Sequence, residues 1–434
     1  MAEYSHNIFD RGYKKTIDWV LIGCYVLLVF IGLINIYASI HSTEGGSIFN
    51  LASRSGKQLV WIITSLGLGT AILFLISPRL WEVISTPAYF AALGLLVAVI
   101  FLGVEVKGSR SWFSFGAVSF QPAEISKITT SLFLAMVMSK SGFKLDKFSN
   151  LLKAGLILGI PMLIILAESE TGSMLVYLGF LIVLYREGMT GWILAFIGLI
   201  IVLFILALTV SPWLSIVILL IIASLFLYFN TRDMRHKTPE WRLIVTSTIA
   251  GVLAGIALII STDFVFNNVL QDHQRKRIEV LLGMKEDPSG VGYNVHQSMI
   301  AIGSGGFFGK GYLNGTQTTY GFVPEQSTDF IFCTVGEEWG FFGCLMVILI
   351  YLVLIFRIVY DAEQSRESFT RIYGYCVASC ISMHLFINIG MTIGLMPVIG
   401  IPLPFVSYGG SSLWTFSIML FIFLALYRQE KKYF

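Results

Sequence analysis

The sequence is poor in charged residues, and this shortage excludes most classes of soluble protein. Only 13% of the 434 residues are Asp, Glu, Lys or Arg, whereas 56% are hydrophobic, and the mean hydropathy is +0.79. A soluble domain of this length cannot hide so much apolar surface in its core. We therefore expect an all-α polytopic membrane protein.

Two further shortages exclude nucleic-acid binding and frameworks built on cysteine. The formal net charge is only +3, and the basic residues are scattered through short segments, so no basic face for nucleic acid is expected. The cysteines form no CxxC pair and have no histidine at metal-ligand spacing. We expect small buried hydrophobic side chains at Cys24, Cys333, Cys344, Cys376 and Cys380.

Long apolar runs are what the sequence does have. Crossing a hydrocarbon core of about 30 Å takes roughly 20 apolar residues. Clear runs of this length lie at 17–38, 57–77, 86–104, 121–139, 190–210, 212–229, 242–262, 329–357, 370–395 and 409–427. A further stretch, 154–186, is broken by "AESETGS" at 167–173, which we interpret as two short spans meeting at a polar turn. The sequence thus predicts about 12 transmembrane helices.

The distribution of Lys and Arg predicts the orientation in the membrane, because short cytoplasmic segments are enriched in these residues. An even number of crossings puts both termini in the cytoplasm and segment 263–328 outside, with helical signals at 264–283 and 294–303. No other segment outside the spans is as long, so we expect residues 1–434 to form a single membrane domain. The basic residues that carry this prediction are Arg11, Lys14, Lys15, Lys144, Lys147, Lys153, Arg232, Arg235, Lys237, Arg428, Lys431 and Lys432.

Asp287 stands before a proline in "DPSGVGY" of the long outer loop. Proline disfavours the helical region for the residue before it, so we expect an extended or turn conformation with the Asp287 carboxylate pointing away from the backbone. Gly290 and Gly292 would let a ligand approach the backbone closely. From the local sequence alone, an ordinary solvent-facing Asp-Pro turn is the alternative.

Charged residues also enter or border the spans. Glu124 and Lys127 are three residues apart on one helical face and can pair at membrane depth; the alternative is a pair that only fixes helix packing. Glu168 and Glu170, at the turn between the two short spans, could bind a cation or hold a basic partner such as Arg110 or Lys127. The alternative is a solvated turn at the membrane edge.

Three more segments combine glycine, proline and charge. "GSGGFFGKG" (303–311) departs from the phosphate-loop pattern, but its backbone amides and Lys310 could still cradle a diphosphate. "GLMPVIGIPLPFVSYGGSS" (394–412) predicts irregular backbone of the kind that lines protein or a cavity, and a transporter site would have the same features. "GFVPEQSTDFIFCTVGEEWGFFG" (321–343) brings acids to the start of a span: Glu325, Asp329, Glu337 and Glu338.

Together these segments resemble the signature segments of the SEDS family, the shape, elongation, division and sporulation proteins. The similar stretches are "GSRSWFSFGAVSFQPAEISK", "DPSGVGYNVHQSMIAIGSGGFFGKGYLNGTQ", "FVPEQSTDFIFCTVGEEWGFFG" and "NIGMTIGLMPVIGIPLPFVSYGGSS". Within the family, "GKGYLNGTQ" is closer to the rod-shape (RodA) branch than to the division (FtsW) branch. Members usually have ten spans, so the hairpin 190–229 is expected to be additional.

The resemblance implies a peptidoglycan glycosyltransferase of the cytoplasmic (inner) membrane, active in cell wall biogenesis and cell shape. Such an enzyme polymerises lipid II, a disaccharide-pentapeptide on undecaprenyl diphosphate. It works with a class B penicillin-binding transpeptidase and the other membrane proteins of the elongation complex.

Carried over by position, the resemblance also implies site residues. The essential loop aspartate of the family falls on Asp287, and "SETGS" puts Glu170 where the family usually has the aspartate of Pro-Asp-Leu-Gly-Thr. Substrate-binding candidates are Arg110, Trp112, Glu124, Lys127, Gln297, Ser298 and Lys310.

The chemistry of the implied reaction agrees with these residue types. Glycosyl transfer from a polyprenyl diphosphate needs a base for the attacking hydroxyl and positive charge for the departing diphosphate. Inversion at the anomeric carbon needs one such carboxylate. We assign the base to Asp287 and the diphosphate to Arg110, Lys127 and Lys310, and leave open whether a divalent cation such as Mg²⁺ assists. The alternatives are a lipid II flippase or transporter, and a non-catalytic scaffold for a transpeptidase.

Overall fold

The computed structural model describes residues 17–44, 47–106, 109–116, 118–210, 212–231, 239–264, 272–282 and 290–430, and the single positions 266, 268, 270 and 284. Contacts divide the chain into two compact units, one made of residues 1–189 and 288–434 and the other of residues 190–287. We call them the large unit and the small unit and describe each by itself. The expectation of a single membrane domain stays a prediction.

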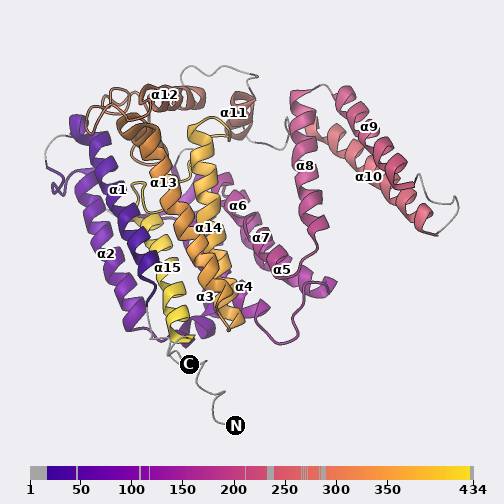
Figure 1. The fold of residues 1–434 in the computed structure, drawn as a ribbon, viewed down its shortest axis with the longest axis horizontal. Helices are drawn as coiled ribbons and strands as arrows, with labels where there is room; N and C mark the ends of the chain where they lie inside the picture. Colours follow the sequence, from indigo (N-terminus) through magenta and orange to yellow (C-terminus); the bar gives the residue numbers. More distant parts are fainter. Residues whose placement is uncertain are drawn as a thin grey trace, which may run out of the picture. The chain divides into compact units, whose positions relative to one another are not determined.

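The large unit is a helical bundle with a small sheet (Figure 1). Within it α13 packs between α1 and α14, α15 packs on α2, and the short α12 lies across the ends of α13 and α14. Its elements are α1 (Trp19–Glu44), α2 (Arg54–Phe74), α3 (Arg79–Leu102), β1 (Val104–Val106), β2 (Ser109–Phe115), β3 (Val118–Phe120), α4 (Pro122–Met138), α5 (Phe148–Ala167), α6 (Thr171–Tyr177), α7 (Phe180–Arg186), α12 (Val291–Ser304), α13 (Ile331–Glu363), α14 (Ser368–Thr392) and α15 (Gly410–Glu430).

Local signals explain where several of these helices begin. Asp18 Oδ1 accepts the backbone N–H groups of Val20 and Leu21 at 2.9 and 3.1 Å, which caps α1. Ser53 Oγ accepts the Gly56 N–H at 3.2 Å and caps α2 in the same way. Pro122 opens α4 at a position where its missing N–H costs no helical hydrogen bond.

The predicted spans are confirmed as helices. In the part of the chain that the structure describes, ten helices are long and apolar enough to cross a membrane: α1, α2, α3, α5, α8, α9, α10, α13, α14 and α15. The 17-residue α4 and the apolar stretch Thr171–Arg186, made of α6 and α7, are shorter. Counted with the ten, these two bring the total to the twelve that we expected.

Several boundaries differ from the prediction, as at Arg79, where α3 begins in place of the expected 86, and one of them changes an interpretation. The stretch expected to begin at 154 begins at Phe148, so its first arm, α5, has 20 residues and is a full-length span. Lys153 therefore lies inside α5, and the expectation that it belongs to a loop is wrong. The polar turn is where we expected it, at residues 168–170 between α5 and α6.

A three-stranded antiparallel sheet between α3 and α4 was not predicted. It has the order β1-β2-β3, with Val104 opposite Trp112 and Phe113 opposite Phe120. The aromatic residues of "SRSWFSF" in β2 favour a strand, and a search for long apolar runs overlooks this signal.

α13 contains a break at Gly340, where φ is 66° and ψ is −160°. The backbone of the segment after α12 fills this break: a Cβ on Gly340 would lie 2.3 Å from Gly309 N. Phe341 N donates to Gly306 O at 2.8 Å and Phe342 N to Phe307 O at 3.2 Å. The glycine-rich segment 303–311 is thus hydrogen-bonded to the broken helix.

The small unit contains α8 (Gly191–Thr209), α9 (Pro212–Thr231), α10 (Pro239–Phe264) and α11 (Asp272–Leu281). The spans predicted at 190–210 and 212–229 are confirmed as α8 and α9. Gly255 allows α10 to approach α9 closely, because a Cβ there would lie 2.7 Å from Leu219 Cδ2. The apolar core of the small unit is formed by Leu203, Ala207, Leu219 and Ile259.

The helical signals predicted in 263–328 are also confirmed. α11 covers much of the first, 264–283, and α12 covers all of the second, 294–303. On α11, Arg275 Nε lies 3.4 Å from Glu279 Oε1, one helical turn away.

Candidate functional site

Buried polar side chains of the large unit converge on residues 393–409, which form neither helix nor strand and which we call the irregular segment. The prediction of irregular backbone here is confirmed. Gly394 and Gly400 have φ of 76° and 74°, a region that side-chain-bearing residues rarely adopt. An irregular backbone at membrane depth needs partners for its own polar groups, and the surrounding helices supply them.

Two buried residues of α14, His384 and Asn388, supply such partners. Together with the buried Thr392, whose hydroxyl donates to Ile389 O within the helix, they form what we call the α14 polar stripe. They follow each other at four-residue spacing and so lie on one helical face. Asn388 Nδ2 donates to Ile401 O at 2.7 Å and to Asp329 O at 2.8 Å. His384 Nδ1 lies 3.1 Å from Pro402 O.

The predicted Glu124–Lys127 pair is confirmed. Lys127 Nζ lies 2.6 Å from Glu124 Oε1, and Lys127 has no exposed surface. The same ammonium lies 2.9 Å from His384 Nε2 and 5.4 Å from the ring centroid of Phe416. A buried ion pair is sustained at this depth only with such additional partners, because desolvation opposes it.

Sequence reasoning missed His384 and Asn388. They are polar residues at i and i+4 within a span, a pattern that marks a polar face and could have drawn attention to both. Their partners could not have been found in this way, because Lys127 is 257 residues from His384 in the chain and the others are backbone carbonyls.

Segment 325–329 packs against the irregular segment. Tyr408 N donates to Ser327 O at 2.9 Å, and Ser407 Oγ donates to Thr328 O at 2.6 Å. Arg54 at the start of α2 donates to Ser327 Oγ at 2.8 Å. Two of the four acids predicted at the start of a span, Glu325 and Asp329, thus lie in a segment held from both sides.

Glu168 and Glu170 lie beside β2. The hydroxyls of Ser109 and Ser111 lie 3.0 and 3.3 Å from Glu170 Oε2. Glu168 is only 2% exposed, and within the described residues neither of its carboxyl oxygens has a hydrogen-bond partner. Burial, and next the charge of Glu170, raise the pKa of Glu168 to about 8.

The basic partners that we considered for these acids are engaged elsewhere. Arg110 is exposed on β2, and its Nε lies 3.6 Å from Glu105 Oε2, while Lys127 pairs with Glu124. Of the possibilities considered for Glu168 and Glu170, a contact with Arg110 or Lys127 is therefore wrong, and a bound cation stays a prediction. The alternative of a solvated turn is wrong for Glu168, which is buried.

Lys310 pairs with Glu337, an acid of the segment 321–343. Its Nζ lies 2.7 Å from Glu337 Oε1 and donates to Thr316 Oγ1 at 2.7 Å. Glu337 also accepts hydrogen bonds from the backbone N–H groups of Thr316, Gln317 and Thr318. A diphosphate that reached Lys310 would have to share its ammonium with Glu337.

The remaining predicted site residues lie on β2 and α12 or outside the described residues. Trp112 is half-buried on β2, and Gln297 is half-buried on α12. Ser298 Oγ donates to Thr392 O at 2.9 Å, which ties α12 to the last residue of α14. Asp287 lies outside the described residues.

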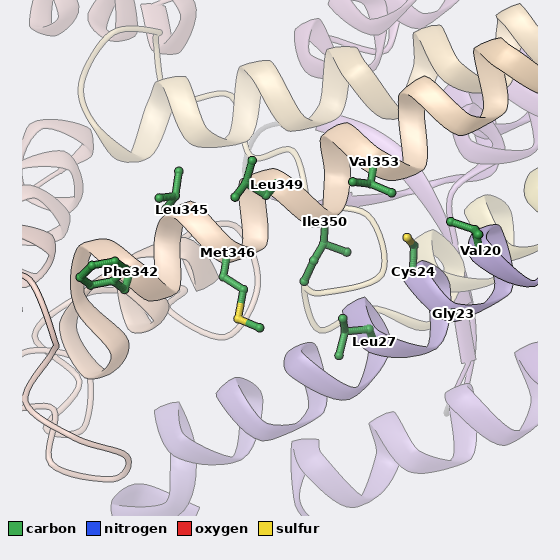
Figure 2. A pocket seen from close by; sticks show the side chains of 10 residues that line it. All are labelled: Val20, Gly23, Cys24, Leu27, Phe342, Leu345, Met346, Leu349, Ile350 and Val353. Atoms are coloured by element: carbon green, nitrogen blue, oxygen red, sulfur yellow. The ribbon is translucent and has the colours of Figure 1, made fainter.

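The groove between α1 and α13 offers no polar chemistry. It has a volume of about 650 Å³, and Figure 2 shows apolar side chains from both helices lining it. Its lining residues are Val20, Gly23, Cys24, Leu27, Phe342, Leu345, Met346, Leu349, Ile350 and Val353.

Metal-binding groups of three or more His, Cys, Asp or Glu are not found in the described part of the chain. The described cysteines are free: Cys333, Cys376 and Cys380 are buried, as expected, and Cys24 and Cys344 are half-buried.

Comparison with known proteins gives matches along almost the whole chain. The family model of the FtsW/RodA/SpoVE proteins, described as "Cell cycle protein", matches residues 18–230 and 214–432. The two matches overlap within α9, the second helix of the hairpin that we expected to be additional.

Among curated relatives, the peptidoglycan glycosyltransferase MrdB of Escherichia coli strain K12 is 30% identical over 410 residues, which cover 93% of each chain. The peptidoglycan glycosyltransferase RodA of Treponema pallidum is 31% identical over 419 residues, which cover 92% of this chain and 94% of the relative.

Two solved structures show the same fold. A chain of the structure described as "Structural coordination of polymerization and crosslinking by a peptidoglycan synthase complex" aligns with a TM-score of 0.68 at 24% identity. The rod shape determining protein RodA of Thermus thermophilus aligns with a TM-score of 0.58 at 23% identity. Each alignment covers 96% of this chain and 98% of the other.

Proposed function

Because this chain belongs to the FtsW/RodA/SpoVE family of cell cycle proteins, we propose that it is a peptidoglycan glycosyltransferase that polymerises lipid II into glycan strands for cell elongation and rod shape. The observation that carries this is the 30% identity to MrdB over 93% of both chains. Its many apolar helices and its relatives make it a multi-pass protein of the inner membrane.

In the proposed mechanism Asp287 acts as general base on the attacking sugar hydroxyl, while cationic groups stabilise the departing diphosphate. Of the three cations considered, Arg110 is supported best, since its side chain is 60% exposed and its contact to Glu105 is long. Lys310 is mostly covered and already neutralised by Glu337, and Lys127 is fully buried. We therefore assign the fully buried Lys127 and Ser298 a role behind the reacting groups, and Trp112 and Gln297 a role at the substrate.

We further propose that both termini are cytoplasmic and that 263–328 is extracytoplasmic. Support comes from arginines that meet at one end of the large unit. Arg357 of α13 pairs with Asp18 before α1, and Arg371 of α14 pairs with Glu187 after α7. Such an arginine-rich end is typical of the cytoplasmic side. A cysteine introduced at Met284 should react with an impermeant maleimide added to intact spheroplasts, whereas a cysteine at Lys144 should not.

A class B penicillin-binding transpeptidase is the partner that we propose, along with other membrane proteins of the elongation complex. The complex named for coordinated polymerization and crosslinking contains a chain of the same fold, which is the support for this step. Newly made strands would then pass directly to a cross-linking enzyme.

The test is polymer formation from labelled lipid II by the purified protein together with its transpeptidase partner. Wild type should form glycan polymer, and Asp287→Asn should reduce the rate by roughly 10²–10⁴-fold, the range expected for loss of a general base, while lipid II binding persists. The matched control is Asp272→Asn, because the Asp272 side chain is 92% exposed on α11. Its rate should equal that of wild type.

Two rival functions give different results in the same experiment. A lipid II flippase would translocate labelled lipid without forming polymer, since it needs no base outside the membrane. A scaffold would leave polymer formation to its partner, and Asp287→Asn would then have no effect. Undiminished polymer from Asp287→Asn would overturn the catalytic assignment.

A further inference from the structure

His384 occupies a bridging position in the large unit. Its Nε2 lies 2.9 Å from Lys127 Nζ on α4, and its Nδ1 lies 3.1 Å from Pro402 O in the irregular segment. Only 1% of the residue is exposed, and its ring packs edge-to-face on Phe416 with 4.7 Å between ring centroids. The imidazole therefore links α4 to the irregular segment.

The two partners determine the form of the imidazole. A carbonyl oxygen only accepts hydrogen bonds, so Nδ1 carries the proton and donates to Pro402 O. An ammonium only donates, so Nε2 presents its lone pair to Lys127. His384 is thus the neutral Nδ1–H tautomer, because a proton on Nε2 would face the Lys127 ammonium.

His384 determines where the Lys127 charge stands relative to the irregular segment. Glu124 is on the same helix as Lys127 and can only hold the ammonium against α4. His384 is the contact across to α14, and through Pro402 it reaches the segment that α12 also touches, where Gly394 faces Met299. Without the imidazole, one N–H of a buried ammonium loses its acceptor.

We propose that His384 is a positioning residue for glycan polymerisation: it fixes the position of the Lys127 ammonium relative to the irregular segment. This inference rests on the proposed function for the reaction that it serves. The residue touches no reacting atom, so its effect reaches the substrate through Lys127 and the backbone at Pro402.

Two variants of His384 separate positioning from packing. His384→Leu fills the space but offers no acceptor, whereas His384→Gln has an amide oxygen for Lys127 and an N–H group for Pro402 O. We expect His384→Leu to lower kcat roughly 10- to 100-fold, the loss expected when a charged group loses a hydrogen bond, with a smaller change in KM. His384→Gln should recover most of the rate.

The matched control is Ser382→Ala on the same helix. The Ser382 hydroxyl bonds only to Ala378 O within α14, at 2.6 Å, so its loss leaves the bridge intact. Its kcat should equal that of wild type. A His384→Leu protein as active as wild type, or a His384→Gln protein as impaired as His384→Leu, would overturn the proposal.

A double-mutant cycle with Lys127→Met tests the contact without substrate. The melting temperatures in detergent of the single and double variants should be non-additive, because the second substitution removes a contact that the first has already broken. Additive shifts would refute the bridge whatever reaction the protein catalyses. Failure of wild type to make polymer would instead refute the proposed function, and the melting cycle distinguishes the two.

Discussion

The Lys310 ammonium lies 2.7 Å from Glu337 Oε1, and the carboxylate that it meets has no exposed surface. Glu337 accepts from the backbone and hydroxyl groups of residues 316–318 as well, so it organises the turn that follows the glycine-rich segment. Lys310 is one contributor among several. The acid, rather than the lysine, is the centre of this contact.

The two partners should therefore differ in what their removal costs. We expect Glu337→Gln to lower the free energy of unfolding by roughly 2–4 kcal/mol, because several buried donors lose a charged acceptor. Lys310→Met should cost less, roughly 1–2 kcal/mol, since Glu337 keeps its backbone and hydroxyl donors from residues 316–318. Thermal unfolding in detergent measures both, and a larger shift for Lys310→Met would contradict this view of the turn.

Glu168 should make stability depend on pH. Its pKa is raised from 4.5 to about 8 in the folded protein, so between these values the folded state keeps a proton that the unfolded state releases. Stability from this group is therefore fully present below about pH 4.5 and is lost as pH rises through 8. Glu168→Gln should have a flatter profile of melting temperature between pH 5 and pH 9, and it should melt higher than wild type at the alkaline end.

Glu170→Gln is the companion variant for this measurement. The negative charge of Glu170 is the second cause of the raised pKa, so its removal should lower the pKa of Glu168, and the alkaline loss of stability should become smaller and end at lower pH. Wild type and Glu168→Gln melting in parallel across this range would contradict a buried, neutral Glu168.

Gly340 should not tolerate a side chain. Its φ of 66° disfavours any residue with a Cβ, and that Cβ would lie 2.3 Å from Gly309 N. We expect Gly340→Ala to cost several kcal/mol of stability, of order 3 or more, since backbone on both sides must shift. The loss of melting temperature should be accompanied by loss of polymer formation, because the segment after α12 is bonded to this break.

Gly94→Ala is the control for this substitution. Gly94 is within α3, and a Cβ there meets no atom within 4 Å. Replacing a helical glycine with alanine at an open position should leave stability unchanged or raise it by about 0.5–1 kcal/mol. Equal destabilisation by both alanines would show that the break in α13 is not a special position.

The spans could be predicted because each depends on its own residues. A helix in hydrocarbon satisfies its backbone within itself, so apolar length alone indicates where it lies. The boundaries differ mainly where charge enters a helix, as at Lys153 in α5 and Arg79 at the start of α3. The Glu124–Lys127 pair could be predicted for the same reason, since three residues on one helix determine the distance between its members.

The contacts of the candidate site could not be predicted in this way. Lys310 was expected to be available to a diphosphate, but Glu337 holds it across 27 positions of the chain. Arg110 was considered for Glu170, but the antiparallel register of β1 and β2 sets it opposite Glu105. In both cases the partner depends on how two segments approach each other, which neither segment encodes alone.

By itself the sequence determined the membrane class, the helical spans, the acid–lysine pair on α4 and the family, because these depend on local composition, helical spacing and ordered motifs. Only the tertiary structure decided that His384 joins Lys127 to Pro402 and that Asn388 holds Ile401 and Asp329. The groups that accept hydrogen bonds from His384 and Asn388 are backbone carbonyls. Every residue has one, so only the packing of the chain selects which of them a buried side chain meets.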